Sequence, residues 1–292
     1  MTEKNCMFVS SRGILHSCDI KSDIPVSSIH QLFHYDWTNL QEGCTVYICN
    51  SAISVFSTII NELPCKIILV SGDADECCPM EIFPTRNDFE LFIENEKIIH
   101  WFSQNLIVSH PKMTKIPIGL DYHTMTISDV WGNSISPFEQ EKQLLNIRNH
   151  SLSFYERKQK IYANFHFALN TKFAKDRIGA ISQIPKDLVF YELSRLERYE
   201  SWKNQSEYTF VASPHGNGLD CHRTWEALCL GCIVIVKTSP LNDLYEELPV
   251  LIVGEWSDIT EEVLLETVEK CKNMGFHYEK LTLDYWMNKI KI

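Results

Sequence analysis

Short apolar runs rich in valine and isoleucine recur along the whole chain, and longer stretches of mixed polarity separate them. Runs of this length and composition, bounded by turn residues, predict strands. They cover residues 6–10, 45–49, 66–70, 105–109 and 115–118 in the first half, and residues 160–163, 188–191, 208–212, 232–236 and 250–253 in the second. Because strands that alternate with helices form mostly parallel sheets covered by helices, we expect an α/β fold.

Helical spacing of apolar positions fills the gaps between the strands of the second half. The predicted helices cover residues 171–181, 194–204, 219–230, 240–248 and 261–273. This repeats the rhythm of the first half and predicts a second α/β unit.

A joining segment is predicted where the two units meet. Ser136, Pro137 and Glu139 have the arrangement of a capping box with proline at the first helical position, so a helix begins here. A chain of 292 residues is also long enough for two domains. We therefore expect one domain over residues 1–150 and another over residues 151–292.

Charge and hydropathy narrow the range of partners. The formal net charge of −11, without any Lys/Arg cluster, disfavours nucleic acid as a partner. The longest apolar runs are far shorter than a membrane span, so we expect no integral membrane segment. The N-terminal stretch MTEKNCMFVSS lacks the pattern of a signal peptide, and the 11 cysteines include several at apolar positions. We expect a reducing, cytoplasmic location.

The stretch SPHGNGLDCHRTWEALCLGCIVIV, residues 213–236, carries the clearest candidate chemistry. A glycine-containing loop with His215, Gly216, Asn217 and Gly218 leads into a helix, and the free N–H groups of a helix N-terminus attract phosphate. On that helix Arg223 and Glu226 are three residues apart and so share one face.

An arginine near a helix N-terminus can bind a diphosphate through two of its own N–H donors. A glutamate farther along the helix can accept hydrogen bonds from ribose hydroxyls. The stretch therefore predicts half of a nucleotide-diphosphate site, with Arg223 on the phosphates and Glu226 on the ribose. An ordinary surface ion pair between the two residues is the alternative. The spacing matches neither a dinucleotide fingerprint nor a P-loop.

Residues 208–241 resemble the C-terminal signature of exostosin-like glycosyltransferases. The matching positions are Gly216, Gly218, Arg223, Glu226-Ala227-Leu228 and Gly231-Cys232-Ile233. The resemblance implies two Rossmann-like domains that face each other across a cleft, the GT-B architecture. It also implies a nucleotide-sugar donor on the C-terminal domain, an acceptor on the N-terminal domain, inversion at the transferred sugar carbon, and no metal or other cofactor.

Such a reaction needs a general base for the acceptor hydroxyl, and the N-terminal half offers candidates. Asp73 and Asp75 follow a predicted strand, where α/β sheets place ligands, and His16 follows the first one. The alternative for either aspartate is a turn former or helix cap. Further cleft candidates are Arg12, His110, Lys112, Asp121, Asn164, His166 and Arg177.

The favoured function is therefore transfer of a sugar, with UDP-sugar as the first expected donor, to a hydroxyl of a glycan or glycoprotein. A noncatalytic nucleotide- or glycan-binding protein of the same fold is the alternative, and a nucleotide-sugar hydrolase is a third. Cys229 and Cys232 have metal-ligand spacing, but they lie at apolar positions and we expect core thiols. A cytoplasmic glycosylation system, of a microbe or of a large virus in its host, fits these expectations.

Overall fold

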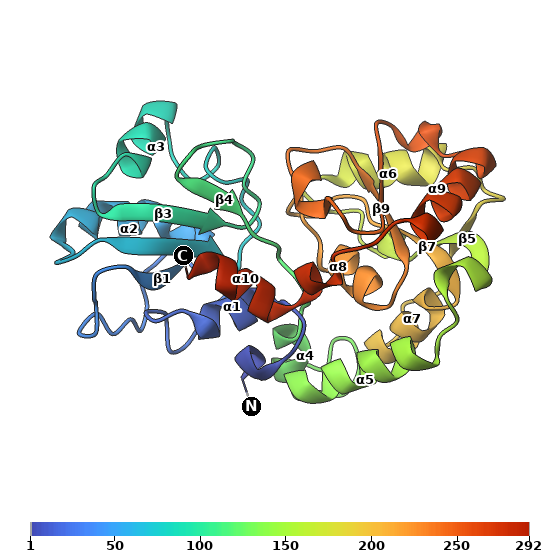
Figure 1. The fold of residues 1–292 in the computed structure, drawn as a ribbon, viewed down its shortest axis with the longest axis horizontal. Helices are drawn as coiled ribbons and strands as arrows, with labels where there is room; N and C mark the ends of the chain where they lie inside the picture. Colours follow the sequence, from blue (N-terminus) through green and yellow to red (C-terminus); the bar gives the residue numbers. More distant parts are fainter. Residues whose placement is uncertain (1, 292) are drawn as a thin grey trace.

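The computed structural model describes residues 2–291, which form two parallel β-sheets surrounded by helices (Figure 1). Four strands make the first sheet and five the second. This mixed α/β arrangement is compatible with two Rossmann-like domains, and the sheets lie on either side of the boundary expected near residue 150.

The first sheet follows chain order, β1-β2-β3-β4. Its strands are β1 (Cys44–Cys49), β2 (Ile67–Gly72), β3 (Ile98–Ser103) and β4 (Met113–Lys115). The register places Val46 beside Leu69, Leu69 beside Trp101 and Trp101 beside Met113, and all four side chains are buried. Since all four strands are parallel, their carboxyl ends lie along one edge.

The second sheet has the order β6-β5-β7-β8-β9. Its strands are β5 (Lys158–Ala163), β6 (Val189–Tyr191), β7 (Tyr208–Ala212), β8 (Ile233–Lys237) and β9 (Val250–Val253). From β5 the chain adds β6 on one side and β7 on the other. In open α/β sheets ligands bind outside the carboxyl ends of the strands at such a reversal, here between β5 and β7.

Ten α-helices occur in the described residues. They are α1 (Ser11–Ser17), α2 (Ile53–Ile59), α3 (Arg86–Ile93), α4 (His123–Ile127), α5 (Pro137–His150), α6 (Ala174–Gln183), α7 (Arg198–Gln205), α8 (His222–Cys229), α9 (Glu261–Asn273) and α10 (Leu283–Ile290). The expected capping box of α5 is confirmed: the Ser136 hydroxyl accepts from the Glu139 N–H, and the Glu139 carboxylate accepts from the Ser136 N–H. None of these helices is long and apolar enough to cross a membrane.

Three apolar clusters hold the molecule together. One joins the first sheet to α2 and α3, and another joins the second sheet to α6 and α9. The third is shared between the sheets: it brings Tyr47 and Phe102 of the first sheet together with Trp225 of α8 and Trp286 of α10. The two sheets are thus packed into one molecule through a common core.

The last helix returns to the beginning of the chain. α10 lies beside α1 (Figure 1), and the Leu283 N–H donates to the Met7 carbonyl at 2.9 Å. A single antiparallel bridge pairs Phe8 with Thr282. Residues near the C-terminal end of the described chain therefore pack with the first sheet, although sequence reasoning assigned all of 151–292 to the second domain.

Several predicted elements differ from the structure. Residues 6–10 form single bridges at Phe8 and Ser10, because Ser10 is already the N-cap of α1. Residues 105–109 are no strand, since Asn105 adopts a left-handed conformation with φ of 50°. The third strand is instead Ile98–Ser103, and the predicted helix at 240–248 is only a short 3₁₀ turn, Asn242–Tyr245.

Candidate functional site

The carboxyl ends of the two sheets face each other, and the segment after β7 fills the junction. This segment, residues 213–221, is called the glycine loop below. The Asp220 N–H donates to Asn105 Oδ1 at 2.9 Å, and Asp220 Oδ2 accepts from the Ile118 N–H at 2.8 Å. Asn105 follows β3 and Ile118 follows β4, so both lie at the carboxyl edge of the first sheet.

Close contacts explain the two glycines of this loop. A Cβ at Gly216 would lie 2.8 Å from Arg177 Nη2. A Cβ at Gly218 would lie 3.0 Å from Asn105 Nδ2 and 3.4 Å from Asp75 Oδ1. The backbone of the glycine loop thus approaches Arg177 on one side and Asp75, from the first half of the chain, on the other.

His215 and Asn217 shape the same loop. The His215 N–H donates to Asp176 Oδ2 at 2.8 Å, and its Nδ1 lies 2.8 Å from the Leu219 carbonyl oxygen. Asn217 Oδ1 accepts from the Lys172 N–H at 3.2 Å. The His215 backbone and the Asn217 side chain therefore hold the loop against residues in or near α6, while the His215 side chain closes the loop on itself.

Arg223 of α8 is held at the reversal between β5 and β7. Its Nε donates to Asn164 Oδ1 at 2.9 Å, and Asn164 directly follows β5. Its Nη1 is buried without a hydrogen-bond partner. Burial lowers the pKa of Arg223; of the neighbouring groups, Cys221 and Glu226 oppose this shift and Arg177 adds to it.

Arg177 of α6 is a second cation beside the loop, and its side chain is buried. Its Nε donates to the His215 carbonyl at 3.0 Å and its Nη1 to the Ala168 carbonyl at 2.5 Å. Among the described residues no carboxylate lies within 4.0 Å of either Arg177 or Arg223. Two guanidinium groups with no described carboxylate within that distance, at a sheet edge, have the chemistry to bind an anion.

Glu226 lies near Arg198 and does not pair with Arg223, which is the partner expected if Arg223 and Glu226 formed an ordinary surface ion pair. Its Oε1 lies 3.7 Å from Arg198 Nη2, and it makes no ion pair with Arg223. Arg198 also lies 3.7 Å from Asp121 Oδ2 and stacks over the Trp131 ring. The glutamate is buried at the junction of the two sheets, and the alternative of a solvated pair is wrong.

Asp121 completes this group of charges. Burial acts to raise the pKa of Asp121, but His222, His123 and Arg198 outweigh burial and hold it well below the usual range. Its Oδ1 lies 3.2 Å from His123 Nδ1. The carboxylate is thus a structural counter-ion at the junction.

Asp73 is fully engaged with its own domain. Its carboxylate lies 3.3 Å from Arg12 Nη2 and accepts from the Ser27 hydroxyl at 2.9 Å. Its N–H donates to Gln104 Oε1 at 2.9 Å, in a left-handed conformation with φ of 57°. Arg12 and Ser27 thus hold the Asp73 carboxylate within its own half of the molecule.

Asp75 is the better placed of the two aspartates. Its carboxylate lies against Gly218, reaches solvent and accepts no hydrogen bond within residues 2–291. The surrounding protein desolvates the carboxylate and raises the pKa of Asp75, while the charge of His222 opposes that shift. A carboxylate with a raised pKa, facing the glycine loop, fits proton acceptance.

The other candidates lie in three different places. His16 is half-buried one turn after Arg12 on α1, where burial and then Arg12 lower the pKa of its imidazole. His110 and Lys112 precede β4 and contact Glu94 at the end of α3, which places them at the opposite edge of the sheet from the glycine loop and corrects the expectation of a cleft position.

His166 lies beside the second sheet, with its Nε2 3.0 Å from the Glu192 carbonyl oxygen after β6. Burial lowers the pKa of this imidazole. The contact with Glu192 places the imidazole on the β6 side of β5, whereas Arg223 lies between β5 and β7.

Sequence reasoning missed three residues that the fold brings to the site. Asn105 was read as part of a strand, Arg198 belongs to no motif, and His222 was quoted within the stretch but given no role. Only the last carried a usable signal, because it directly precedes Arg223 at the start of the helix.

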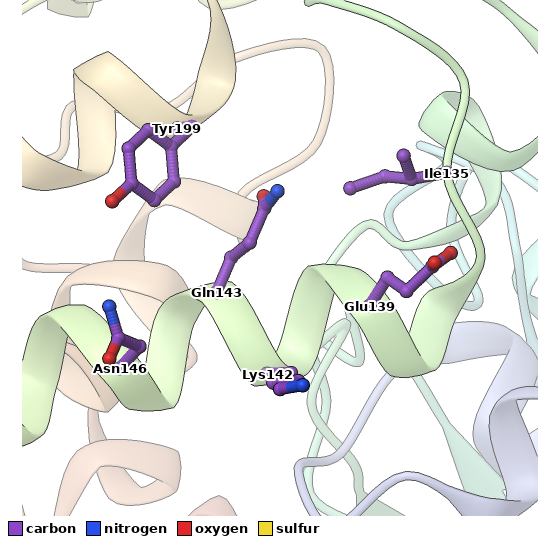
Figure 2. A pocket seen from close by; sticks show the side chains of 6 residues that line it. All are labelled: Ile135, Glu139, Lys142, Gln143, Asn146 and Tyr199. Atoms are coloured by element: carbon purple, nitrogen blue, oxygen red, sulfur yellow. The ribbon is translucent and has the colours of Figure 1, made fainter.

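Two hollows lie near α6 and α5. The first, of about 770 Å³, adjoins the glycine loop at His215 and is lined on other sides by Phe173, Thr238 and Trp256. The second, of about 410 Å³, is drawn in Figure 2, where Gln143 and Asn146 rise from α5 toward Tyr199 of α7. No predicted site residue lines the second hollow, so only the first belongs with the site.

The cysteines and the possible metal ligands add no residue to the candidate site. All 11 cysteines are free, and Cys229 and Cys232 are buried as expected of core thiols. Within residues 2–291 no group of three or more His, Cys, Asp and Glu side chains is arranged to hold a metal ion.

No protein-family model matches this chain, and no curated protein is similar enough to it to count as a relative.

Proposed function

We propose that the protein is a glycosyltransferase of the GT-B, exostosin-like kind that uses a nucleotide-diphosphate sugar as donor. The observation that carries the proposal is the pair Arg223 and Arg177, two arginines without a carboxylate partner among the described residues, beside a glycine loop at the sheet reversal. Arg177 is buried, and Arg223 is partly buried with an unpartnered Nη1. A diphosphate supplies the missing negative charge, and its oxygens accept from the unpartnered Nη1 of Arg223.

The glycine loop lets the donor approach its backbone closely. Gly216 and Gly218 leave no side chain between the loop and its neighbours, and the hollow of about 770 Å³ at His215 can take another part of the donor. Glu226 keeps its ribose-binding role in this proposal, since Arg198 approaches only Oε1 and at 3.7 Å. UDP-sugar is the first donor to test.

The chemistry is a displacement at the sugar carbon. The acceptor oxygen bonds to that carbon while the bond to the diphosphate breaks, and the departing diphosphate gains negative charge. Fixed positive charges at that position stabilise the transition state more than the ground state. Arg223 and Arg177 are suited to that role, and inversion follows from a single displacement.

A reducing, cytoplasmic setting belongs to the same proposal. Its support is the set of 11 free cysteines, since a chain with that many thiols in an oxidising compartment is expected to form disulfides.

The test compares nucleotide binding by wild type, Arg223→Ala and the control Arg86→Ala, which removes an exposed arginine of α3. Thermal unfolding is followed with millimolar UDP, GDP, ADP, CMP or NAD. A ligand at ~100 times its Kd adds about 2.7 kcal/mol, which raises the midpoint by several degrees. We expect one nucleoside diphosphate to stabilise wild type and Arg86→Ala but not Arg223→Ala.

If none of the nucleotides raises the unfolding midpoint of the wild type, the proposal is contradicted. It is also contradicted if Arg223→Ala retains the stabilisation. Incubation with the matching nucleotide sugar and a glycan acceptor then separates a transferase, which forms a glycoside, from a binding protein, which consumes no donor.

A further inference from the structure

His222 reaches across the junction of the two sheets. It is the first residue of α8, and its Nδ1 lies 2.8 Å from the carbonyl oxygen of Gly119, which follows the last strand of the first sheet. The imidazole is partly exposed, and it stands one residue before Arg223.

The partner of Nδ1 fixes the tautomer of this imidazole. A carbonyl oxygen can only accept a hydrogen bond, so Nδ1 carries the proton and donates. In the neutral ring the lone pair is then on Nε2. No residue in 2–291 bonds Nε2, and this atom is not among the buried unpartnered ones, so it is open to an incoming ligand.

The groups around His222 come from three segments. Asp75 follows β2, Asp121 and His123 lie at the start of α4, and Asp220 is in the glycine loop. The His123 ring lies 6.4 Å from the His222 ring. Three carboxylates therefore place negative charge around the imidazole.

The other candidate bases are less well prepared. Asp73 is paired with Arg12, and no hydrogen bond connects His16 to the glycine loop. Asp75 and His222 remain: Asp75 follows β2 and lies against Gly218, and His222 begins α8 after the glycine loop.

We propose that His222 is a catalytic residue, the general base whose Nε2 takes the proton of the acceptor hydroxyl. The inference rests on the proposed transferase function. As the O–H bond breaks, its electron pair stays on the oxygen, which bonds to the sugar carbon. The electron pair of the carbon–phosphate oxygen bond leaves with the diphosphate beside Arg223. Asp75 faces the resulting imidazolium and balances its charge.

His222→Asn tests this role with little change of shape, because the Asn amide can still donate to the Gly119 carbonyl while nothing replaces Nε2. His110→Asn is the matched control, since His110 lies at the opposite edge of the first sheet. We expect His222→Asn to lower kcat at least ~100-fold, with nucleoside diphosphate binding retained, and His110→Asn to keep wild-type kcat.

The pH profile separates proton transfer from a merely structural role. A general base acts only in its unprotonated form, so wild-type kcat should fall on the acid side, and this limb should be absent from the residual activity of His222→Asn. A His222→Asn enzyme with wild-type kcat and an unchanged acid limb overturns the inference.

A second readout does not depend on activity. Nitrogen NMR of ¹⁵N-histidine protein, with His222 assigned by comparison with His222→Asn, should show the Nδ1–H tautomer at a pH where the ring is neutral. The Nε2–H tautomer overturns the inference even if transfer occurs. Absence of nucleotide binding in wild type, by contrast, counts against the proposed function on which it rests.

Discussion

At the scale of single residues, Gly119 shows how strictly one position is specified. Its φ is +65°, and a Cβ there would lie 2.2 Å from the Val9 carbonyl oxygen. Gly43 has a similar φ of +76°, but nothing lies within 4 Å of its Cβ position. The two glycines share a left-handed backbone conformation and differ in the space around them.

We therefore predict that Gly119→Ala destabilises the protein far more than Gly43→Ala. The control should cost about 1–2 kcal/mol, the penalty for a left-handed non-glycine residue. Gly119→Ala should add a clash with backbone worth about 1–3 kcal/mol or more. Urea unfolding of the two variants measures the difference, and equal midpoints would contradict the contact with Val9.

Residues of the candidate site were only partly predictable. The proposed roles of Gly216 and Arg223 follow from a loop that leads into a helix, which is a local pattern. The partners of Arg223 do not, because Asn164 is 59 residues away in the chain and meets it only when β5 and β7 pair. Asp73 and Asp75 look alike in sequence, and their different surroundings depend on Arg12 and on the opposite sheet.

At the scale of elements, the capping box of α5 makes a separate prediction. Ser136→Ala removes the acceptor for the Glu139 N–H and should destabilise the protein by about 0.5–2 kcal/mol. Ser182→Ala on the exposed face of α6 is the control, where alanine suits a helix interior and the change should be near zero. Thermal unfolding without ligand measures both, and an unaffected Ser136→Ala would show that α5 needs no cap.

Elements of the second sheet were predicted better than those of the first. Strands 208–212 and 250–253 and the helix at 261–273 agree with the structure at both ends. Their apolar runs are uninterrupted or strictly periodic. Strand Ile98–Ser103 was missed because His100 breaks its apolar run, and the structure satisfies that imidazole through the Thr114 hydroxyl at 2.8 Å.

At the scale of the whole molecule, the shared core predicts cooperative unfolding. Trp225, Trp286 and Phe102 belong to one buried cluster that spans both sheets. Neither sheet can lose its packing without exposing apolar surface of the other, so calorimetry should show one transition. Trp286→Ala should lower that single midpoint, since truncating a buried tryptophan costs about 3–5 kcal/mol. Two resolved transitions would contradict the shared core.

The return of α10 to α1 also sets an order of events during synthesis. Ile14 and Leu15 of α1 belong to the shared core, and Leu283 packs beside Gly13. The ribosome must add well over two hundred residues after α1 before its partner helix emerges, which takes on the order of tens of seconds. Until then the apolar face of α1 lacks its native cover, so the nascent N-terminal half is the part of this chain most in need of a chaperone.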